Sequence, residues 1–124
     1  MTHLVYYKYE RDLFPETSKY FKAITPVEAL GLTCLVCNRF NLPLPKLDIR
    51  KLKCSKFVFY KNPANDTQKN YREIVYHKNY LIVGDVSHET GHYLQFHKLG
   101  TTRHDRKLAR VVIGIQKYLD TIIT

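Results

Sequence analysis

Five consecutive residues, His88-Glu89-Thr90-Gly91-His92, constrain this chain more than any other segment. On an α-helix, side chains four positions apart share one face and lie about 6 Å apart, so both histidines can reach one metal ion. Imidazole nitrogens bind zinc at about 2.0–2.1 Å. Glu89 follows the first histidine, where its carboxylate can take a proton from a water molecule beside the metal. The alternative is a solvated helix face that carries two histidines by chance.

A catalytic zinc site needs three protein ligands and one open position. No glutamate follows Glu89, which removes a downstream glutamate as the third ligand. His104 is the favoured candidate, because the chain turns back before it and a new helix begins there. Asp105 is the neighbouring alternative. His97 is a weaker one, because it lies about 140° around the helix from His92 and points away from the metal.

The length of 124 residues suits one domain with its own core, and we expect a single domain over residues 1–124. No apolar stretch approaches the roughly 18 residues that cross a bilayer. The first residues lack the apolar region of a signal peptide. We therefore expect a cytoplasmic protein with no membrane partner.

The chain has three cysteines, Cys34, Cys37 and Cys54. An odd count without a signal peptide argues against a disulfide framework. Cys34 and Cys37 form a C-x-x-C pair, but Cys54 is the only obvious third ligand, and a closed zinc site needs four. The apolar sequence around the pair favours two small hydrophobic residues on a core helix.

The formal net charge is +9, and lysines and arginines gather in residues 46–61 and 98–110. The chain also contains 10 tyrosines and 6 phenylalanines. Basic segments with aromatic residues suit the backbone and exposed bases of nucleic acids. A solvated, lysine-rich surface explains the pattern equally well, and no recognised DNA-reading motif is present. DNA is therefore a possible partner, through this basic surface.

Capping signals predict a first helix from Thr25 to about Phe40. Thr25 supplies the N-cap, Pro26 suits the first turn, and Glu28 completes a capping box. Residues 1–15 fit a helix, a strand or an extended arm, and the choice stays open. The inward side chains of the predicted helix are Ala29, Leu32, Leu35, Val36 and Phe40.

Two β-rich segments, 56–60 and 71–76, are separated by a turn. The helix with the histidine pair should begin between Tyr80 and Asp85, with Asp85 as a possible N-cap, and end near Leu99 before Gly100. A last helix over 105–118 should bury Leu108, Val111, Val112, Ile115 and Leu119. This order predicts an α+β fold with a short antiparallel or mixed sheet packed on helices.

The segment 88–108 resembles the SprT-like (Spartan-type) metallopeptidase domain. That family has H-E-x-x-H, a spacer with a turn, and a third histidine followed by a helix. The order of elements extends the resemblance over residues 25–120, although only 88–108 is specific. The resemblance implies a small zincin-like domain with a zinc ion on His88, His92 and His104.

The chain departs from that family after the third histidine. The family usually has glycine next and an aromatic residue a few positions later, where this chain has Asp105 and Leu108. It also lacks a separate DNA-binding or zinc-ribbon region. WLM-type and minigluzincin proteins are similar in size and order, but the minigluzincins use a downstream glutamate that is absent here.

The sequence and the resemblance together predict a zinc metalloendopeptidase of the H-E-x-x-H type with Glu89 as general base. Its substrate is a protein or peptide and, by family analogy, a protein bound to DNA. We expect an edge strand at 71–76 to hold the extended peptide. Tyr93 and Arg103 are the candidates for the group that stabilises the oxyanion.

Two alternatives remain open. The first is a nucleic-acid-binding or regulatory protein on a zincin scaffold, without useful peptidase activity. The second is a latent peptidase whose cleft is covered by residues 1–15 or 118–124.

Overall fold

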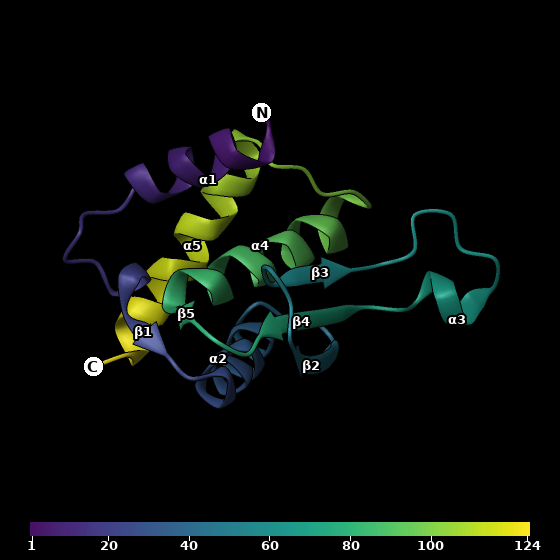
Figure 1. Ribbon diagram of the computed structural model, residues 1–124. Coiled ribbons are helices and arrows are strands. Elements are labelled where there is room, and N and C mark those ends of the chain that lie inside the picture. The colour runs from purple at the N-terminus through teal and green to yellow at the C-terminus, as the bar shows by residue number, and fades with distance from the viewer.

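The computed structural model describes the whole chain, residues 1–124. Helix α4 (Val83–Leu99) is its central element (Figure 1). Helix α5 (Arg106–Ile122) packs along α4, and α2 (Pro26–Arg39) lies against both. Helix α1 (His3–Asp12) covers the beginning of α5. Together with two small sheets these helices form a small α+β domain, as the sequence predicts.

Five strands form the two sheets. In the three-stranded sheet, β4 (Glu73–His77) lies between β2 (Lys46–Arg50), to which it is parallel, and β3 (Lys56–Val58), to which it is antiparallel. In the other sheet, β1 (Ala23–Ile24) pairs antiparallel with β5 (Leu81–Ile82). The larger sheet is therefore mixed, and β3 is the edge strand that contacts α4.

The prediction of an exposed, substrate-holding edge at residues 71–76 is wrong. That segment becomes β4, which is paired on both sides and has its first four residues buried. The reason is β2, which the sequence analysis missed although its residues alternate between charged and apolar, the pattern of a half-buried strand.

The capping box at the start of α2 is confirmed. The Thr25 hydroxyl accepts from the Glu28 amide at 3.1 Å, and the Glu28 carboxylate accepts from the Thr25 amide at 3.0 Å. Such a box satisfies two amides that the first helical turn leaves unpaired. Leu35, predicted to point inward, is 46% exposed, whereas Val36 beside it is fully buried.

Residues 1–15 contain α1, which resolves the choice left open by the sequence. Its N-cap is Thr2, whose hydroxyl accepts from the Val5 amide. A short 3-10 helix, η1 (Lys19–Phe21), follows it and packs on α4. One further helix, α3 (Asp66–Lys69), lies at the tip of the arm between β3 and β4 (Figure 1).

The core has two parts. The larger one joins α2, α4, α5 and the mixed sheet through residues such as Val36, Ile74 and Ile115. The smaller one fastens α1 and η1 to α5 through Tyr6, Tyr20, Leu108, Ala109 and Val112. Burying one large aliphatic or aromatic side chain contributes about 1.5–3 kcal/mol. Helix α1 is thus part of the packed structure.

Helix α4 ends as predicted, at Leu99. Gly100 has φ +73°, a left-handed conformation that glycine adopts without a steric penalty. The helix begins at Val83, within the predicted interval, but Asp85 is not its N-cap. The Asp85 carboxylate instead reaches back from the first turn to accept from the Ile82 amide at 2.8 Å.

The last helix begins as predicted, with Asp105 as N-cap accepting from the Leu108 amide at 3.0 Å. It extends to Ile122, beyond the predicted residue 118, because Leu119 is still buried in the core. The close approach of α5 to α4 requires a small residue at Gly91, since a Cβ there would lie 2.9 Å from Val112 Cγ2.

The three cysteines carry free thiols. Cys37 is buried in the larger core, as predicted for a small hydrophobic residue, whereas Cys34 and Cys54 are exposed. None of the helices is both long and apolar enough to cross a bilayer.

Candidate metal centre

Three histidine side chains converge at one point above α4. The Nε2 atom of His92 lies 3.1 Å from that of His88 and 3.1 Å from that of His104. Their ligand atoms all lie within 4.8 Å of one another. Two nitrogens that bind one tetrahedral zinc at about 2.05 Å lie about 3.3 Å apart. The spacing of the histidines therefore suits a shared metal ion.

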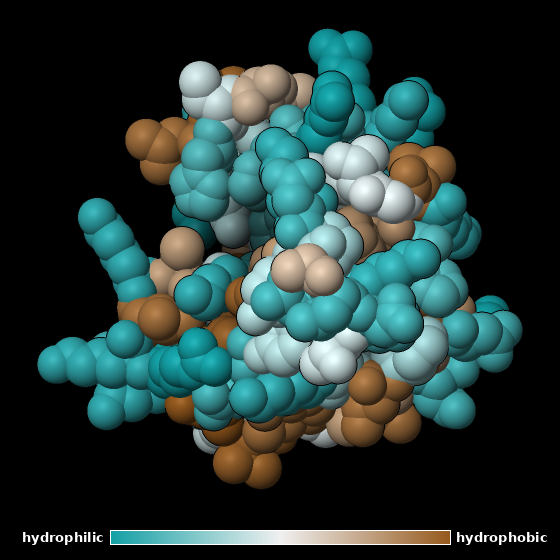
Figure 2. Space-filling model, turned by 90° about the vertical axis from the view of Figure 1, so that its right-hand side faces the viewer, coloured by the Kyte–Doolittle hydropathy of each residue, from teal (hydrophilic) through white to brown (hydrophobic).

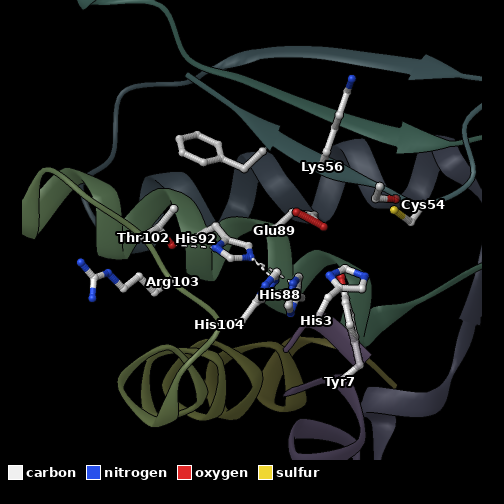
Figure 3. Close-up of a pocket in the computed structure, with 12 residues that line it drawn as sticks. His3, Tyr7, Cys54, Lys56, His88, Glu89, His92, Thr102, Arg103 and His104 are labelled. Atoms are coloured by element: carbon white, nitrogen blue, oxygen red, sulfur yellow. Dashed lines mark hydrogen bonds between the residues drawn. The ribbon is translucent and has the colours of Figure 1, made fainter. Parts of the chain in front are cut away.

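The two histidines of α4 occupy the positions expected from their spacing. Their side chains lie on one face, and both are buried, with exposed fractions of 2% for His88 and 9% for His92. This excludes the alternative of a solvated helix face. His104 comes from the segment between Gly100 and α5, which turns back over the end of α4 (Figure 3).

The other candidates for the third ligand lie elsewhere. His97 is exposed near the end of α4 and belongs to no metal-binding group. The Asp105 carboxylate caps α5. The structure therefore brings together His88, His92 and His104, the three residues that the sequence favoured.

A buried carboxylate from α1 holds His88. His88 Nδ1 donates to Glu10 Oε1 at 2.9 Å, across 78 positions of sequence. The hydroxyl of Tyr6 donates to the same oxygen at 2.7 Å, and that of Tyr20 donates to Oε2. Glu10 is completely buried, so these hydrogen bonds replace the water that its carboxylate loses. A carboxylate behind a metal-binding histidine fixes its ring and tautomer.

His92 is held by a second chain of hydrogen bonds. The Arg103 amide donates to Gln95 Oε1 at 3.1 Å, which fixes the orientation of that side-chain amide. The Thr102 hydroxyl donates to the same oxygen at 2.8 Å. Because the Thr102 hydroxyl proton is used in this bond, Thr102 Oγ1, which lies 2.6 Å from His92 Nδ1, must accept a hydrogen bond from that nitrogen.

The hydrogen-bond partners of His88 and His92 determine which ring nitrogen of each is free to bind a metal ion. Because Nδ1 donates in His88 and in His92, the Nε2 atom of each neutral ring carries a free lone pair. The two Nε2 lone pairs face each other at 3.1 Å, an arrangement that a cation between them stabilises. The donor set and its hydrogen bonds thus fit a metal ion.

Burial and neighbouring charges determine the protonation of the ligands. Burial, followed by the neighbouring His88 and His104, lowers the pKa of His92 to about 2. Burial, followed by His88 and His3, lowers the pKa of His104 to about 4. Burial acts in the same direction on His88, but the hydrogen bond to Glu10 and the negative charges of Glu89, Glu10 and Asp85 together outweigh it and raise that pKa. Two ligands are therefore neutral at pH 7, while in His88 a proton competes with the metal.

Glu89 lies beside the three histidines and is 3% exposed. Burial raises its pKa to about 7, whereas the positive charge of His88 and a hydrogen bond from the Phe57 backbone act in the opposite direction. A carboxylate with a pKa near the working pH can both accept and return a proton. A dication bound nearby would lower this pKa.

The site opens into a pocket of about 330 Å³. The floor is formed by α4, one wall by Ser55, Lys56 and Phe57 at β3, and the other by His3 and Tyr7 of α1. Figure 3 shows these side chains around the histidines. Helix α1 thus forms a wall of the pocket and leaves it open.

Neither candidate for oxyanion stabilisation reaches the metal centre. Tyr93 lies behind Phe57, on whose ring it stacks; its hydroxyl donates to Pro43 O at 2.6 Å and it does not line the pocket, so this prediction is wrong. Arg103 lines the pocket at its rim, but its side chain is exposed and points away from the histidines in Figure 3.

Sequence reasoning missed the contribution of α1. His3, Tyr7 and Glu10 lie three or four positions apart, the spacing of one helical face, but nothing local in the sequence links that face to α4. Thr102 was also missed, because its role depends on the turn at Gly100.

Fold and site together define a small α+β protein with a buried group of three histidines that can hold a metal ion. Comparisons with protein-family models, with curated proteins and with solved structures gave no match.

Proposed function

We propose that the protein is a zinc-dependent metallopeptidase. The observation that carries this proposal is the position of Glu89, a buried carboxylate beside three converging histidines at the base of an open pocket. The order of these residues along the chain, similar to that of SprT-like peptidases, supports the same function.

Zinc is the metal that we infer for the site. Three imidazole ligands with an open fourth position are one of the arrangements found in catalytic zinc sites. When bound, zinc supplies a Lewis acid that polarises a water molecule and the substrate carbonyl. The hydrogen bonds from His88 to Glu10 and from His92 to Thr102 orient two of the ligands for this task.

In the proposed reaction, Glu89 moves the proton. It takes a proton from the water molecule while the water oxygen bonds to the carbonyl carbon, whose π electrons move to the carbonyl oxygen. It then gives the proton to the amide nitrogen as the C–N bond breaks, which leaves a carboxylic acid and an amine. Burial raises the pKa of Glu89 and a bound dication lowers it, so at neutral pH with zinc bound the carboxylate is ionised and can accept the proton.

We propose β3 as the strand that holds the substrate. It is one of the two edge strands of the mixed sheet and the one whose residues Lys56 and Phe57 line the pocket. An extended peptide can pair with such an edge through main-chain hydrogen bonds. Residues from β3 then place the scissile bond over Glu89, which lines the same pocket as Lys56 and Phe57.

DNA remains a second proposed partner. Apart from Lys61, which follows β3, the basic residues of 46–61 lie on β2, β3 and the loop between them; Lys56 lines the metal pocket, and Lys53 lines a neighbouring pocket. The face that carries the arm with α3 is largely hydrophilic (Figure 2). A protein bound to DNA would meet the basic surface and the pocket together. Salt-dependent DNA binding without Glu89-dependent hydrolysis would favour a nucleic-acid-binding protein instead.

The test is the substitution Glu89→Gln, measured on zinc-loaded protein with fluorescent casein. We expect full zinc content and loss of hydrolysis, because the amide is of similar size but cannot accept the proton. Removing zinc with a chelator should abolish wild-type activity, and adding zinc should restore it. Hydrolysis by the variant at the wild-type rate would refute the proposed mechanism.

A further inference from the structure

Helix α1 directs two side chains into the metal pocket. His3 and Tyr7, one helical turn apart, both line it, and their ring centroids lie 4.6 Å apart. Tyr7 also stacks on His88, with 4.6 Å between centroids and 26° between ring planes. Figure 3 shows both side chains rising from α1 toward the histidines. The Tyr7 ring is thus held between a metal-binding histidine and His3.

Most tyrosine hydroxyls around the site are held by protein groups. Those of Tyr6 and Tyr20 donate to Glu10, that of Tyr76 bonds to Thr33 Oγ1, and that of Tyr93 donates to Pro43 O. Tyr7 is different, because its half-buried side chain ends in the pocket beside Glu89. Its hydroxyl is therefore available to a molecule that occupies the pocket.

We propose that Tyr7 is the residue that stabilises the oxyanion: its hydroxyl donates a hydrogen bond to the substrate carbonyl oxygen as that oxygen gains negative charge. The inference rests on the proposed peptidase function. A peptide on β3 enters from the wall opposite α1, so its carbonyl group lies between Glu89 and Tyr7. Arg103, the other candidate that the sequence suggested and that lines the pocket, points away from the histidines (Figure 3).

The packing of α1 keeps the hydroxyl in place. The neighbouring Tyr6 is buried in the smaller core and bonds to Glu10, which in turn bonds to His88. Tyr7 is therefore fixed relative to the same ligand that it stacks on. A donor already in position acts on the transition state without reorganisation, and removing one typically lowers kcat by about 10²–10³-fold.

The test compares Tyr7→Phe with Tyr9→Phe. Phenylalanine retains the stacking on His88 and removes only the hydroxyl. Tyr9 lies on the same helix and packs on the smaller core without lining the pocket, so it controls for an effect on α1 itself. Zinc content, thermal unfolding and the kinetics of casein hydrolysis are measured for the wild type, both variants and Glu89→Gln. Calorimetry measures the binding of an N-phosphoryl dipeptide, whose phosphoryl oxygens imitate the tetrahedral oxyanion.

For Tyr7→Phe we expect one zinc per chain and a wild-type unfolding temperature. Its kcat should fall about 10²-fold or more, with KM changed little, and its affinity for the phosphoryl dipeptide should fall at least about tenfold. Tyr9→Phe should behave as the wild type. Wild-type kcat and dipeptide affinity in Tyr7→Phe, with Glu89→Gln inactive, would overturn the role of Tyr7 and leave the peptidase function intact. A wild type without Glu89-dependent hydrolysis would overturn both.

Discussion

Replacing Glu10 with glutamine should weaken zinc binding although Glu10 does not reach the metal. Glutamine has nearly the same shape, so one side-chain oxygen still accepts from His88 and Tyr6, and its amide donates to Tyr20. What is lost is the negative charge behind His88. A hydrogen bond to a charged group contributes about 1.5–3 kcal/mol and a neutral one about 0.5–1.5 kcal/mol.

The difference of about 1–1.5 kcal/mol corresponds to roughly a tenfold weaker affinity, at 1.36 kcal/mol per factor of ten. It lies at the lower end of the 10–100-fold loss, about 1.4–2.7 kcal/mol, that removing a partner behind a metal ligand typically causes. We therefore expect the Kd for zinc to rise roughly tenfold at a pH above the pKa of His88.

The effect should depend on pH. In the wild type Glu10 raises the pKa of His88, so below that pKa a bound proton competes with zinc and the affinity falls as pH falls. Without the carboxylate the pKa of His88 is lower, and proton competition begins at a lower pH. The ratio of the two dissociation constants should therefore be largest above the wild-type pKa of His88 and decrease toward pH 5.

Competition with a chromophoric zinc chelator over pH 5–8 measures both effects. The matched control is Glu73→Gln, which also neutralises a buried carboxylate, but one bonded to Arg50 and Tyr71 in the sheet. It should bind zinc as the wild type does. Wild-type zinc affinity in folded Glu10→Gln at every pH would refute the reasoning that Glu10 supports the metal site.

Two other substitutions test the site and its support. His104→Ala should lose stoichiometric zinc, measured by elemental analysis, whereas His97→Ala should retain it because His97 is exposed and outside the histidine group; undiminished zinc in His104→Ala would exclude His104 as a ligand. Gly84→Ala places a Cβ against the ring of Tyr20, so the ring must move and its hydrogen bond to Glu10 is disturbed. We expect about 1–3 kcal/mol of destabilisation from the overpacking. Zinc binding should also weaken, because Glu10 holds His88. Gly31→Ala, with no atom within 4 Å of the new Cβ, should be neutral or slightly stabilising in chemical denaturation; equal stability of the two variants would contradict this packing argument.

Features of the site that depend on short sequence distances could be predicted. His88 and His92 share a face because they lie one helical turn apart. His104 follows a chain reversal that the helix-ending glycine, Gly100, predicts. The same local rules predict α2 and the start of α5, whose capping side chains lie within three positions of the amides that they bind.

The contribution of α1 depends on a contact that no local pattern encodes. Glu10 lies 78 positions before His88, and read alone it is an acidic residue on a tyrosine-rich helix. The strand β2 is different, because its residues Lys46–Arg50 alternate between charged and apolar, a local pattern typical of a half-buried strand. What no local pattern states is that β2 pairs with β4. That pairing, like the contact of Glu10 with His88, is determined by tertiary packing.

Because Glu10 of α1 holds His88, the metal site is complete only when α1 has packed onto the rest of the domain. His88 and His92 of α4 and His104 of the turn that follows it can approach each other early, since they are close in sequence. Glu10 joins them only when the two ends of the chain have packed together. Zinc binds more tightly when α1 is docked and Glu10 holds His88. By linkage, bound zinc therefore stabilises the docked position of α1 by the same free energy. Metal loading and the docking of the first helix are therefore coupled equilibria, and the loss of either one weakens the other.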